Sequence, residues 1–210
     1  MITVHHLNNS RSQRILWLLE ELGLNYEIRH YARDSVTNLA PKELMAIHPL
    51  GKSPVITDGD LSIAETGAIV EYIIRTYGKG KLIPAANSND FNLYTQFLHA
   101  SEGSVMLPIL LSLYVGFLGE AGAPLHPKIT QEMKTQLDYL EYHLVGHEYF
   151  AGAELTGADI MMIFPLEAAR ARGRLKVYPS CAEYVDKIHK RPAYIRAVER
   201  GGEYAYGPKS

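Results

Sequence analysis

The segment Asn8-Asn9-Ser10-Arg11-Ser12 places small hydrogen-bonding side chains between a short apolar strand and a strongly periodic helix. Side chains of this kind either satisfy the free N–H groups at a helix start or hold a reactive atom of a ligand. Serine is among the best helix-capping residues, so capping alone would explain Ser10. The chemistry of this segment therefore depends on the ligand that it meets.

The cysteine and histidine content limits the reactions that the chain can carry out. Cys181 is the only cysteine, which excludes an intrachain disulfide, a CxxC redox pair and a multi-cysteine metal site. His5 and His6 are adjacent on a predicted strand and point to opposite faces, and the other histidines have no spacing typical of metal ligands. We expect no metal site, and any sulfur chemistry must use mainly the sulfur of a ligand.

The composition is that of a water-soluble globular protein. Hydrophobic residues make up 47% and charged residues 21% of 210 residues, and no apolar run approaches the roughly 18 residues that cross a bilayer. The first residues lack the pattern of a secretory signal, which favours a cytoplasmic location. The net charge of -2, with Lys and Arg scattered, argues against nucleic acid or a membrane as the main partner.

Hydrophobic periodicity in the first 80 residues predicts a strand and helix unit followed by a hairpin and a helix. Residues 1–7 form a strand, apolar positions at helical spacing follow until Gly23, and residues 25–32 alternate as a second strand. A right-handed crossover makes these two strands parallel. Two short strands, 55–57 and 61–63, surround the turn signal Asp58-Gly59, and a helix then runs from about Glu65 to Gly78.

After a Gly-, Pro- and Asn-rich linker at 78–89 the strand signals end. Helical patterns cover 91–118, with a kink expected at Pro108, and then 128–144, 158–173 and 180–191. The sequence predicts an α/β fold followed by an all-α fold. We expect two domains, 1–80 and 88–210.

Four stretches give the chain a resemblance to a known family. They are "NNSRSQRILWLLEEL" (8–22), "HPLGKSPV" (48–55), "DGDLSIAETGAI" (58–69) and "LTGADIMM" (155–162). In this order and spacing the chain resembles the cytosolic-type glutathione S-transferases, in particular serine- or asparagine-site members of bacterial or fungal type. The resemblance covers essentially the whole chain. It implies a thioredoxin-like glutathione domain, a C-terminal helical bundle, a homodimer, and glutathione as co-substrate without a cofactor.

The resemblance also implies which residues bind glutathione. These are Lys52, Ser53, Pro54, Val55, Glu65 and Thr66. Pro54 would follow a cis peptide bond that turns the backbone of Val55 toward the cysteinyl part of the tripeptide, as an added strand would pair. Glu65 would bind the γ-glutamyl ammonium and Thr66 its carboxylate, at a helix N-terminus that favours an anion.

If glutathione is the ligand, a hydrogen-bond donor to its thiolate is expected near residues 8–12. A free thiol of pKa about 8.5 is only about 3% thiolate at pH 7, and the thiolate is the nucleophile. One hydrogen bond to the thiolate contributes roughly 1.5–3 kcal/mol, or about one to two pKa units. Serine chemistry in the family selects Ser10, whereas the family's spacing from the helix selects Asn9. We favour Ser10, with Asn9 as the alternative and Arg11 as electrostatic support.

The predicted function is conjugation of glutathione to small apolar electrophiles, typical of detoxification. The electrophile pocket is expected around Met106, Leu107, Leu110 and Tyr114, with Tyr204 and Tyr206 near it. Residues Thr156 to Asp159 have the form of a capping box and are interpreted as structural. Peroxide reduction at the same thiolate is an alternative, and so is a non-catalytic binding or scaffold protein of the same fold.

Overall fold

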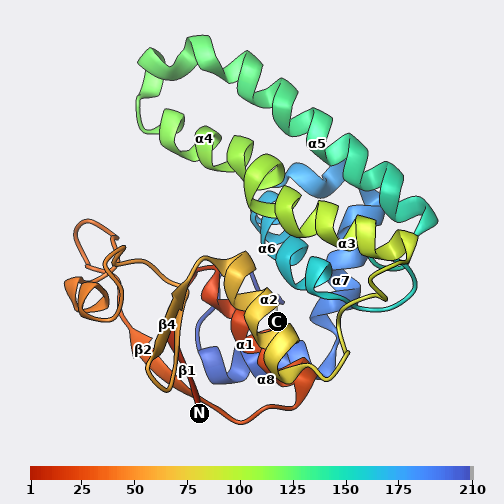
Figure 1. Cartoon of the computed structure of the whole chain (residues 1–210). Helices are drawn as coiled ribbons and strands as arrows, with labels where there is room; N and C mark the ends of the chain where they lie inside the picture. Colours follow the sequence, from red (N-terminus) through yellow and green to blue (C-terminus); the bar gives the residue numbers. More distant parts are fainter. Residues whose placement is uncertain (209–210) are drawn as a thin grey trace. The chain divides into compact units, whose positions relative to one another are not determined.

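The computed structural model describes residues 1–208, which form two compact units. The first unit consists of Met1–Ile83 together with the chain from Lys187 on, and the second unit is Pro84–Asp186. The last helix of the expected domain 88–210 thus belongs to the first unit, and its residues 209–210 lie outside the described residues. Figure 1 shows the strands in the first unit.

The first unit contains a four-stranded sheet with the strand order β2-β1-β3-β4. β1 pairs in parallel with β2, and β3 is antiparallel both to β1 and to β4. The elements are β1 (Ile2–Leu7), α1 (Ser12–Leu22), β2 (Tyr26–Tyr31), the short 3-10 helix η1 (Lys42–Ala46), β3 (Val55–Asp58), β4 (Leu61–Ala64) and α2 (Thr66–Tyr77). This order confirms the predicted thioredoxin-like arrangement.

α1 lies between the sheet and α8 (Pro192–Gly201) and is buried on almost every side. Its five consecutive residues from Ile15 to Leu19 are all fully buried. The Trp17 indole N–H donates to Glu21 at 2.8 Å, and its ring packs edge-on against Tyr194 with centroids 5.6 Å apart. A helix whose central turns are apolar on several sides needs cover on more than one face, and α8 supplies the second cover.

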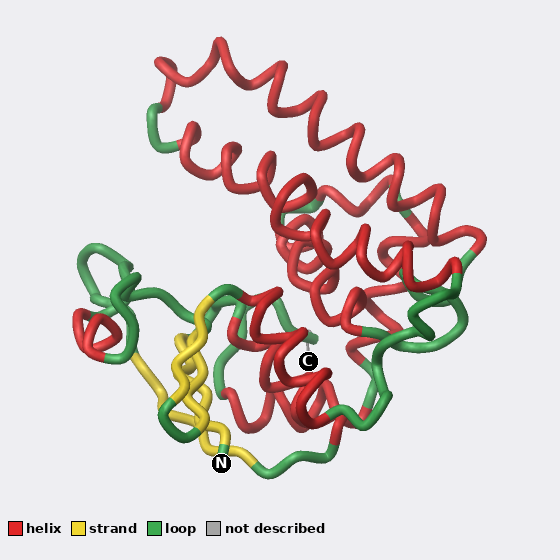
Figure 2. The backbone as a smooth tube through the Cα atoms, in the orientation of Figure 1, coloured by secondary structure: helices red, strands yellow, loops and turns green. Residues whose placement is uncertain are grey.

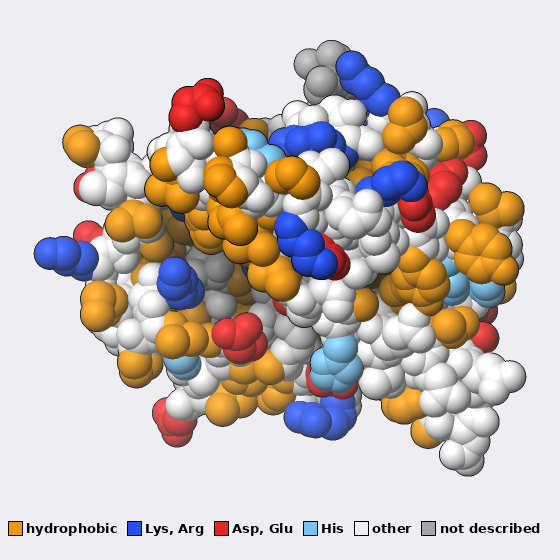
Figure 3. Space-filling view, turned by 90° about the horizontal axis from the view of Figure 1, so that it is seen from above, with side chains coloured by type: hydrophobic (Ala, Val, Ile, Leu, Met, Phe, Trp, Pro, Cys, Tyr) orange, Lys and Arg blue, Asp and Glu red, His pale blue; other side chains and the backbone are white. Residues whose placement is uncertain are grey.

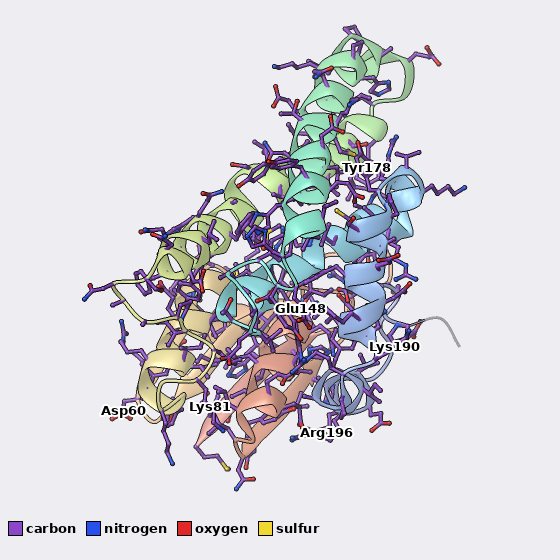
Figure 4. The ribbon with its side chains drawn as sticks, turned by 90° about the vertical axis from the view of Figure 1, so that its right-hand side faces the viewer. Asp60, Lys81, Glu148, Tyr178, Lys190 and Arg196 are labelled. Atoms are coloured by element: carbon purple, nitrogen blue, oxygen red, sulfur yellow. The ribbon has the colours of Figure 1, made fainter. Side chains whose placement is uncertain are left out.

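Ion pairs fix the direction in which α8 crosses α1. Arg191 pairs with Glu21 at 2.6 Å, and Glu20 accepts hydrogen bonds from Arg196 at 2.8 Å and Arg200 at 2.9 Å. Arg196 is labelled on α8 in Figure 4. Because the arginines are partly exposed, these pairs contribute mainly orientation, and the apolar contact of α1 with α8 contributes most of the stability.

The second unit is helical throughout its described elements, drawn as red tube in Figure 2. They are α3 (Asn89–Ala100), the π-helix η2 (Ser101–Val105), α4 (Met106–Gly116), the 3-10 helix η3 (Gly119–Leu125), α5 (His126–Gly146), α6 (Gly157–Ala171), the 3-10 helix η4 (Arg174–Val177) and most of α7 (Pro179–His189). Tyr178, labelled in Figure 4, lies against α5, where its hydroxyl donates to Asp138 at 3.0 Å.

The expected kink near Pro108 is realised as a widened helical turn. The chain from Asn89 to Gly116 stays helical, with the π-helical segment Ser101–Val105 between α3 and α4. Pro108 lacks an N–H, and its ring would meet the carbonyl of Ser104 in a regular helix. A π-turn at this point removes the conflict without ending the helix.

The same helical stretch, Asn89–Gly116, is long and apolar enough to cross a membrane by length and composition alone, with mean hydropathy 1.3 in its most apolar window. Buried residues make up 39% of that window, and core helices of soluble proteins meet the same criterion. This helix carries scattered polar residues and so contains no uninterrupted apolar run of that length in the sequence.

Asp159 organises the start of α6. Its carboxylate is fully buried and accepts from Thr156 N at 2.8 Å, Phe150 N at 3.0 Å and the Tyr184 hydroxyl at 2.8 Å. The Thr156 side chain completes the predicted capping box. One carboxylate thus joins the loop before α6, the helix itself and α7.

Replacing Asp159 by Ala is expected to lower the free energy of unfolding by about 3 kcal/mol or more, because several buried donors lose their acceptor. Asp186→Ala is the matched control. Asp186 is a carboxylate on α7 of the same unit, but it pairs with Arg170 at an exposed position. It should cost at most about 1 kcal/mol. Urea unfolding of both variants measures the difference, and equal losses would contradict this role of Asp159.

Candidate active site

The loop between β1 and α1 spans only residues 8–11. Asn9 adopts a left-handed conformation with φ 51°, which asparagine tolerates better than most residues. α1 begins at Ser12, and the residue before it, Arg11, makes no side-chain capping bond. The Ser10 hydroxyl oxygen accepts from Ser12 N at 3.2 Å. Ser10 therefore satisfies one free N–H of the helix start without occupying the capping position itself.

The Ser12 side chain lies at the centre of the hydrogen bonds around the loop. It is fully buried, and its hydroxyl lies 3.3 Å from Leu7 N and 3.2 Å from Leu7 O. It also contacts Ser10 Oγ at 2.7 Å and His6 Nδ1 at 2.9 Å. This one hydroxyl joins the end of β1 to the start of α1.

His6 is the second residue that the sequence analysis did not assign to the site. Its side chain is buried, and burial together with the neighbouring His30 lowers the pKa of His6 to about 4, although a hydrogen bond to the Gly201 backbone opposes this. His6 is therefore neutral at pH 7. His5 points to the opposite face, as predicted for adjacent strand residues, and contacts the Tyr31 hydroxyl at 2.8 Å.

Both asparagines of the loop are held by distant parts of the chain. Asn9 Oδ1 accepts from Ala205 N at 2.7 Å, in the segment after α8. Arg33 donates to the backbone carbonyls of Asn8 and Asn9, both at 3.3 Å. Neither Arg33 nor Ala205 carries a sequence signal for this role, since each acts through a contact made only in the folded chain.

The residues predicted to bind glutathione lie at the same end of the sheet as this loop. His5 is opposite Val55 and Val55 is opposite Ala64 in antiparallel pairs. The chain after β1, the chain before β3 and the chain after β4 therefore leave the sheet at one end. This brings together residues 8–11, 52–54 and 65–66, which are separate in the sequence.

The segment before β3 has the expected cis peptide bond between Ser53 and Pro54. The Ser53 hydroxyl donates to His5 O at 2.9 Å, and Lys52 is exposed. The expectation for Val55 is wrong, because β3 is an inner strand and Val55 is fully buried between His5 and Ala64. Its backbone offers no free edge, so only the residues before Pro54 can pair with an extended ligand.

Glu65 and Thr66 begin α2 in an unusual conformation. Glu65 has φ 68° and ψ 118°, is exposed, and makes no side-chain capping bond. Thr66 is 4% exposed. Non-glycine residues held at positive φ are concentrated at ligand sites, where the surrounding structure maintains the strain. Glu65 therefore occupies the N-cap position of α2 while its side chain makes no capping bond.

The expected electrophile residues lie on α4 and differ in exposure. Met106 is 3% exposed and belongs to the core of the helical unit. Leu107 is 51% and Tyr114 is 58% exposed, and Leu110 is half-buried. Leu107, Leu111, Tyr114 and Leu118 are all exposed at the spacing of one helix face. Figure 3 shows hydrophobic side chains gathered at the surface.

The remaining cysteine and the two C-terminal tyrosines complete the description of the predicted residues. Cys181 is fully buried in α7, and burial followed by the nearby Glu141 carboxylate raises the pKa of its thiol. It is therefore not a nucleophile. Tyr204 and Tyr206 pack edge-on against each other with ring centroids 5.6 Å apart. Within residues 1–208, no group of three His, Cys, Asp or Glu side chains is arranged to hold a metal ion.

Two family models match this chain. Residues 1–75 match the glutathione S-transferase N-terminal domain, and residues 123–187 match the glutathione S-transferase C-terminal domain. Glutathione S-transferase 3 of Schizosaccharomyces pombe is 35% identical, over 95% of this chain and 88% of that protein. Glutathione S-transferase 1 of Saccharomyces cerevisiae is 30% identical, over 95% of both chains.

Solved structures show the same likeness. A glutathione S-transferase from Actinobacillus pleuropneumoniae has 35% identity and a TM-score of 0.89, over 99% of this chain and 100% of that chain. A glutathione transferase family member from Pseudomonas fluorescens, crystallised with two glutathione molecules bound, has 26% identity and a TM-score of 0.79, over 94% of this chain and 92% of that chain.

The neutral state of His6 makes stability depend on pH. Its pKa is about 4 in the folded chain against a reference value of 6.5, so between these values the unfolded chain binds a proton that the folded chain does not. This contribution is complete above pH 6.5 and is lost as the pH falls toward 4, a decrease of about 3 kcal/mol in the free energy of unfolding.

Urea unfolding at several pH values measures this slope in the wild type, in His6→Asn and in His126→Asn, whose histidine is exposed. The slope should be smaller in His6→Asn and unchanged in His126→Asn. The same slope in all three proteins would show that His6 is not the buried neutral group.

Proposed function

Because this chain belongs to the glutathione S-transferase family, we propose that it transfers the thiolate of glutathione to small apolar electrophiles. The observation that carries the proposal is the meeting of residues 8–11, 52–54 and 65–66 at one end of the sheet. A tripeptide needs a charged subsite for each end and a donor for its thiol, and these three segments supply such groups.

Glu65 and Thr66 are assigned to the γ-glutamyl end of glutathione. The exposed Glu65 carboxylate binds its ammonium group, while the Thr66 hydroxyl and the free N–H groups at the start of α2 bind its carboxylate. The backbone at Ser53 pairs with the cysteinyl part, in place of the buried Val55. Lys52 binds the glycyl carboxylate, which its exposed position supports.

Ser10 is assigned as the partner of the thiol, with Arg11 as electrostatic support. Two observations favour Ser10 over Asn9. The Asn9 side-chain oxygen already accepts from Ala205 N at 2.7 Å, and Asn9 turns into a left-handed conformation that serves the loop. Ser10 is 7% exposed, so a small part of it remains accessible.

The exposed Leu107 and Tyr114 and the half-buried Leu110 of α4 are proposed to contact the electrophile. We also propose a homodimer, which sedimentation velocity of the purified protein tests. A cytoplasmic location is part of the same proposal. The family match and the single buried cysteine support it, and cell fractionation tests it.

Ultraviolet absorbance of bound glutathione across pH tests the thiolate assignment. The wild type should show thiolate about one to two pH units below the pKa of free glutathione. Ser10→Ala should abolish that shift, while Asn9→Ala should retain most of it. If glutathione binds without any shift, the protein is a binding member of the family and not a transferase.

Removing the Thr66 hydroxyl tests the γ-glutamyl subsite. Thr66→Val keeps the shape but deletes a hydrogen bond to a charged carboxylate, so the Kd for glutathione should rise about tenfold or more. Thr66→Ser keeps the hydroxyl and should bind almost as the wild type does. Calorimetric titration measures both, and equal affinity of Thr66→Val and wild type would exclude this contact.

A further inference from the structure

A continuous row of hydrogen-bonding groups leads from Ser10 into the core of the first unit. Ser10 Oγ lies 2.7 Å from Ser12 Oγ, which lies 2.9 Å from His6 Nδ1. The Gly201 backbone at the end of α8 raises the pKa of the His6 ring. Ser10, Ser12 and His6 are 7%, 0% and 2% exposed. The row therefore starts at a hydroxyl that is slightly accessible and ends at a buried titratable group.

The hydrogens along this row have a definite direction. A neutral imidazole carries one hydrogen, and the Gly201 backbone raises the pKa of His6, as an acceptor of the ring N–H does, so we assign the hydrogen to the ring nitrogen on the Gly201 side. Since Nδ1 faces Ser12, the protonated nitrogen is Nε2. The Ser12 hydroxyl then donates to His6 Nδ1 at 2.9 Å in preference to the more distant Leu7 O at 3.2 Å. The Ser10 hydroxyl in turn donates to Ser12 Oγ.

This direction has a consequence for the ligand. The Ser10 hydrogen points inward, and one lone pair of its oxygen accepts from Ser12 N at 3.2 Å. The other lone pair remains for the ligand. In the resting state Ser10 can thus accept a hydrogen bond from a thiol, but it cannot donate one to a thiolate.

We propose that a thiol bound at Ser10 loses its proton inward, through the hydroxyls of Ser10 and Ser12, to Nδ1 of His6. The inference rests on the proposed function. His6 and Ser12 touch no substrate and act through Ser10.

In this transfer, each bond to hydrogen that breaks is matched by a bond to hydrogen that forms. The S–H bond breaks and sulfur keeps the electron pair. Ser10 Oγ receives the thiol proton and passes its own hydrogen to Ser12 Oγ, which passes its own to His6 Nδ1. The products are a thiolate, two neutral hydroxyls and an imidazolium. The hydrogens now point outward, so Ser10 donates to the thiolate that it has helped to form.

The groups around His6 limit how long this state lasts. The Gly201 carbonyl on α8 favours the imidazolium, and the thiolate two hydroxyls away attracts it in a site with little water. Burial and the His30 ring on β2, with centroid 5.5 Å away, oppose it. Once the thiolate charge is consumed by the new bond to the electrophile, burial again favours neutral His6, and the proton returns through Ser12 and Ser10 to the leaving group of the electrophile or to solvent.

Nitrogen NMR of the histidine rings in the full-length wild-type chain tests the transfer. On addition of glutathione, His6 Nδ1 should change from an unprotonated to a protonated ring nitrogen, together with the appearance of thiolate absorbance. S-methylglutathione is the control ligand, because it has the same charged ends but no thiol proton, and it should leave Nδ1 unprotonated.

The matched variants are His6→Asn and His5→Asn. Asparagine at position 6 keeps a side-chain oxygen that can accept from Ser12 but cannot take up a proton at neutral pH. Its kcat/KM should fall about 100-fold at pH 7, the scale of a lost acid–base group, with the glutathione KM changed less than about twofold. His5 is an equally buried neighbour on β1 whose ring faces away, so His5→Asn should keep kcat/KM within about threefold.

The outcomes separate this inference from the proposed function. A wild type that forms thiolate while Nδ1 stays unprotonated overturns the transfer but leaves the transferase proposal intact. Wild-type kcat/KM in His6→Asn, or equal losses in both variants, also overturns it. If neither glutathione nor S-methylglutathione binds, the proposed function fails and the inference falls with it. The ring measurement uses the wild type and needs no folded variant.

Discussion

The hydrogen bonds of the Ser12 hydroxyl are the constraint on which the functional end of the first unit depends. Ser12 is the first residue of α1, and it contacts both backbone polar groups of Leu7 at the end of β1. The Ser12 hydroxyl thus connects the end of the strand to the start of the helix across a loop of only four residues. This connection restricts where Asn9 and Ser10 can lie. These bonds lie in a buried environment, where they are stronger and where an unpaired group costs more than at the surface. The row from Ser10 to His6 exists because the same hydroxyl also faces both of those side chains.

The return of the chain end to the first unit completes this arrangement. α8 covers the apolar α1, and its end brings the Gly201 backbone to His6. In the segment after α8, the Ala205 backbone N–H donates to the Asn9 side chain. A Cβ at position 201 would lie 2.6 Å from Gln13 Oε1 and 2.9 Å from Leu16 Cδ1, so a larger residue there would require these α1 side chains to shift. A helix that sequence order assigns to the second half of the protein therefore supports the loop of the first half. The ion pairs of Glu20 and Glu21 with arginines of α8 hold this crossing in one direction.

Local patterns were sufficient for much of the fold and for part of the candidate site. Apolar spacing predicted α1 and α2, and period-two alternation predicted β2. The capping box at Thr156 also needs only neighbouring residues, and it is present. The error at Val55 has a different origin. A proline before a short strand is compatible with an edge or with an inner strand that it merely precedes, and only the strand order β2-β1-β3-β4 distinguishes the two. Helical spacing likewise does not reveal which face of a helix meets the core, and Met106, expected at the electrophile pocket, is buried in the helical unit.

The amino-acid sequence by itself determined the order of elements, the two halves of different fold class, the family resemblance and the segments that carry the candidate site. These follow from residue type and short-range spacing, which act before the chain is folded. Only the tertiary structure decided that Ser12 and His6 stand behind Ser10, that Arg33 and Ala205 hold the asparagines, and that α8 belongs to the first unit. Each of these is a contact between residues distant in sequence or turned toward one another by the pairing of β1. Such contacts depend on burial and hydrogen-bond geometry, which no single residue or spacing specifies.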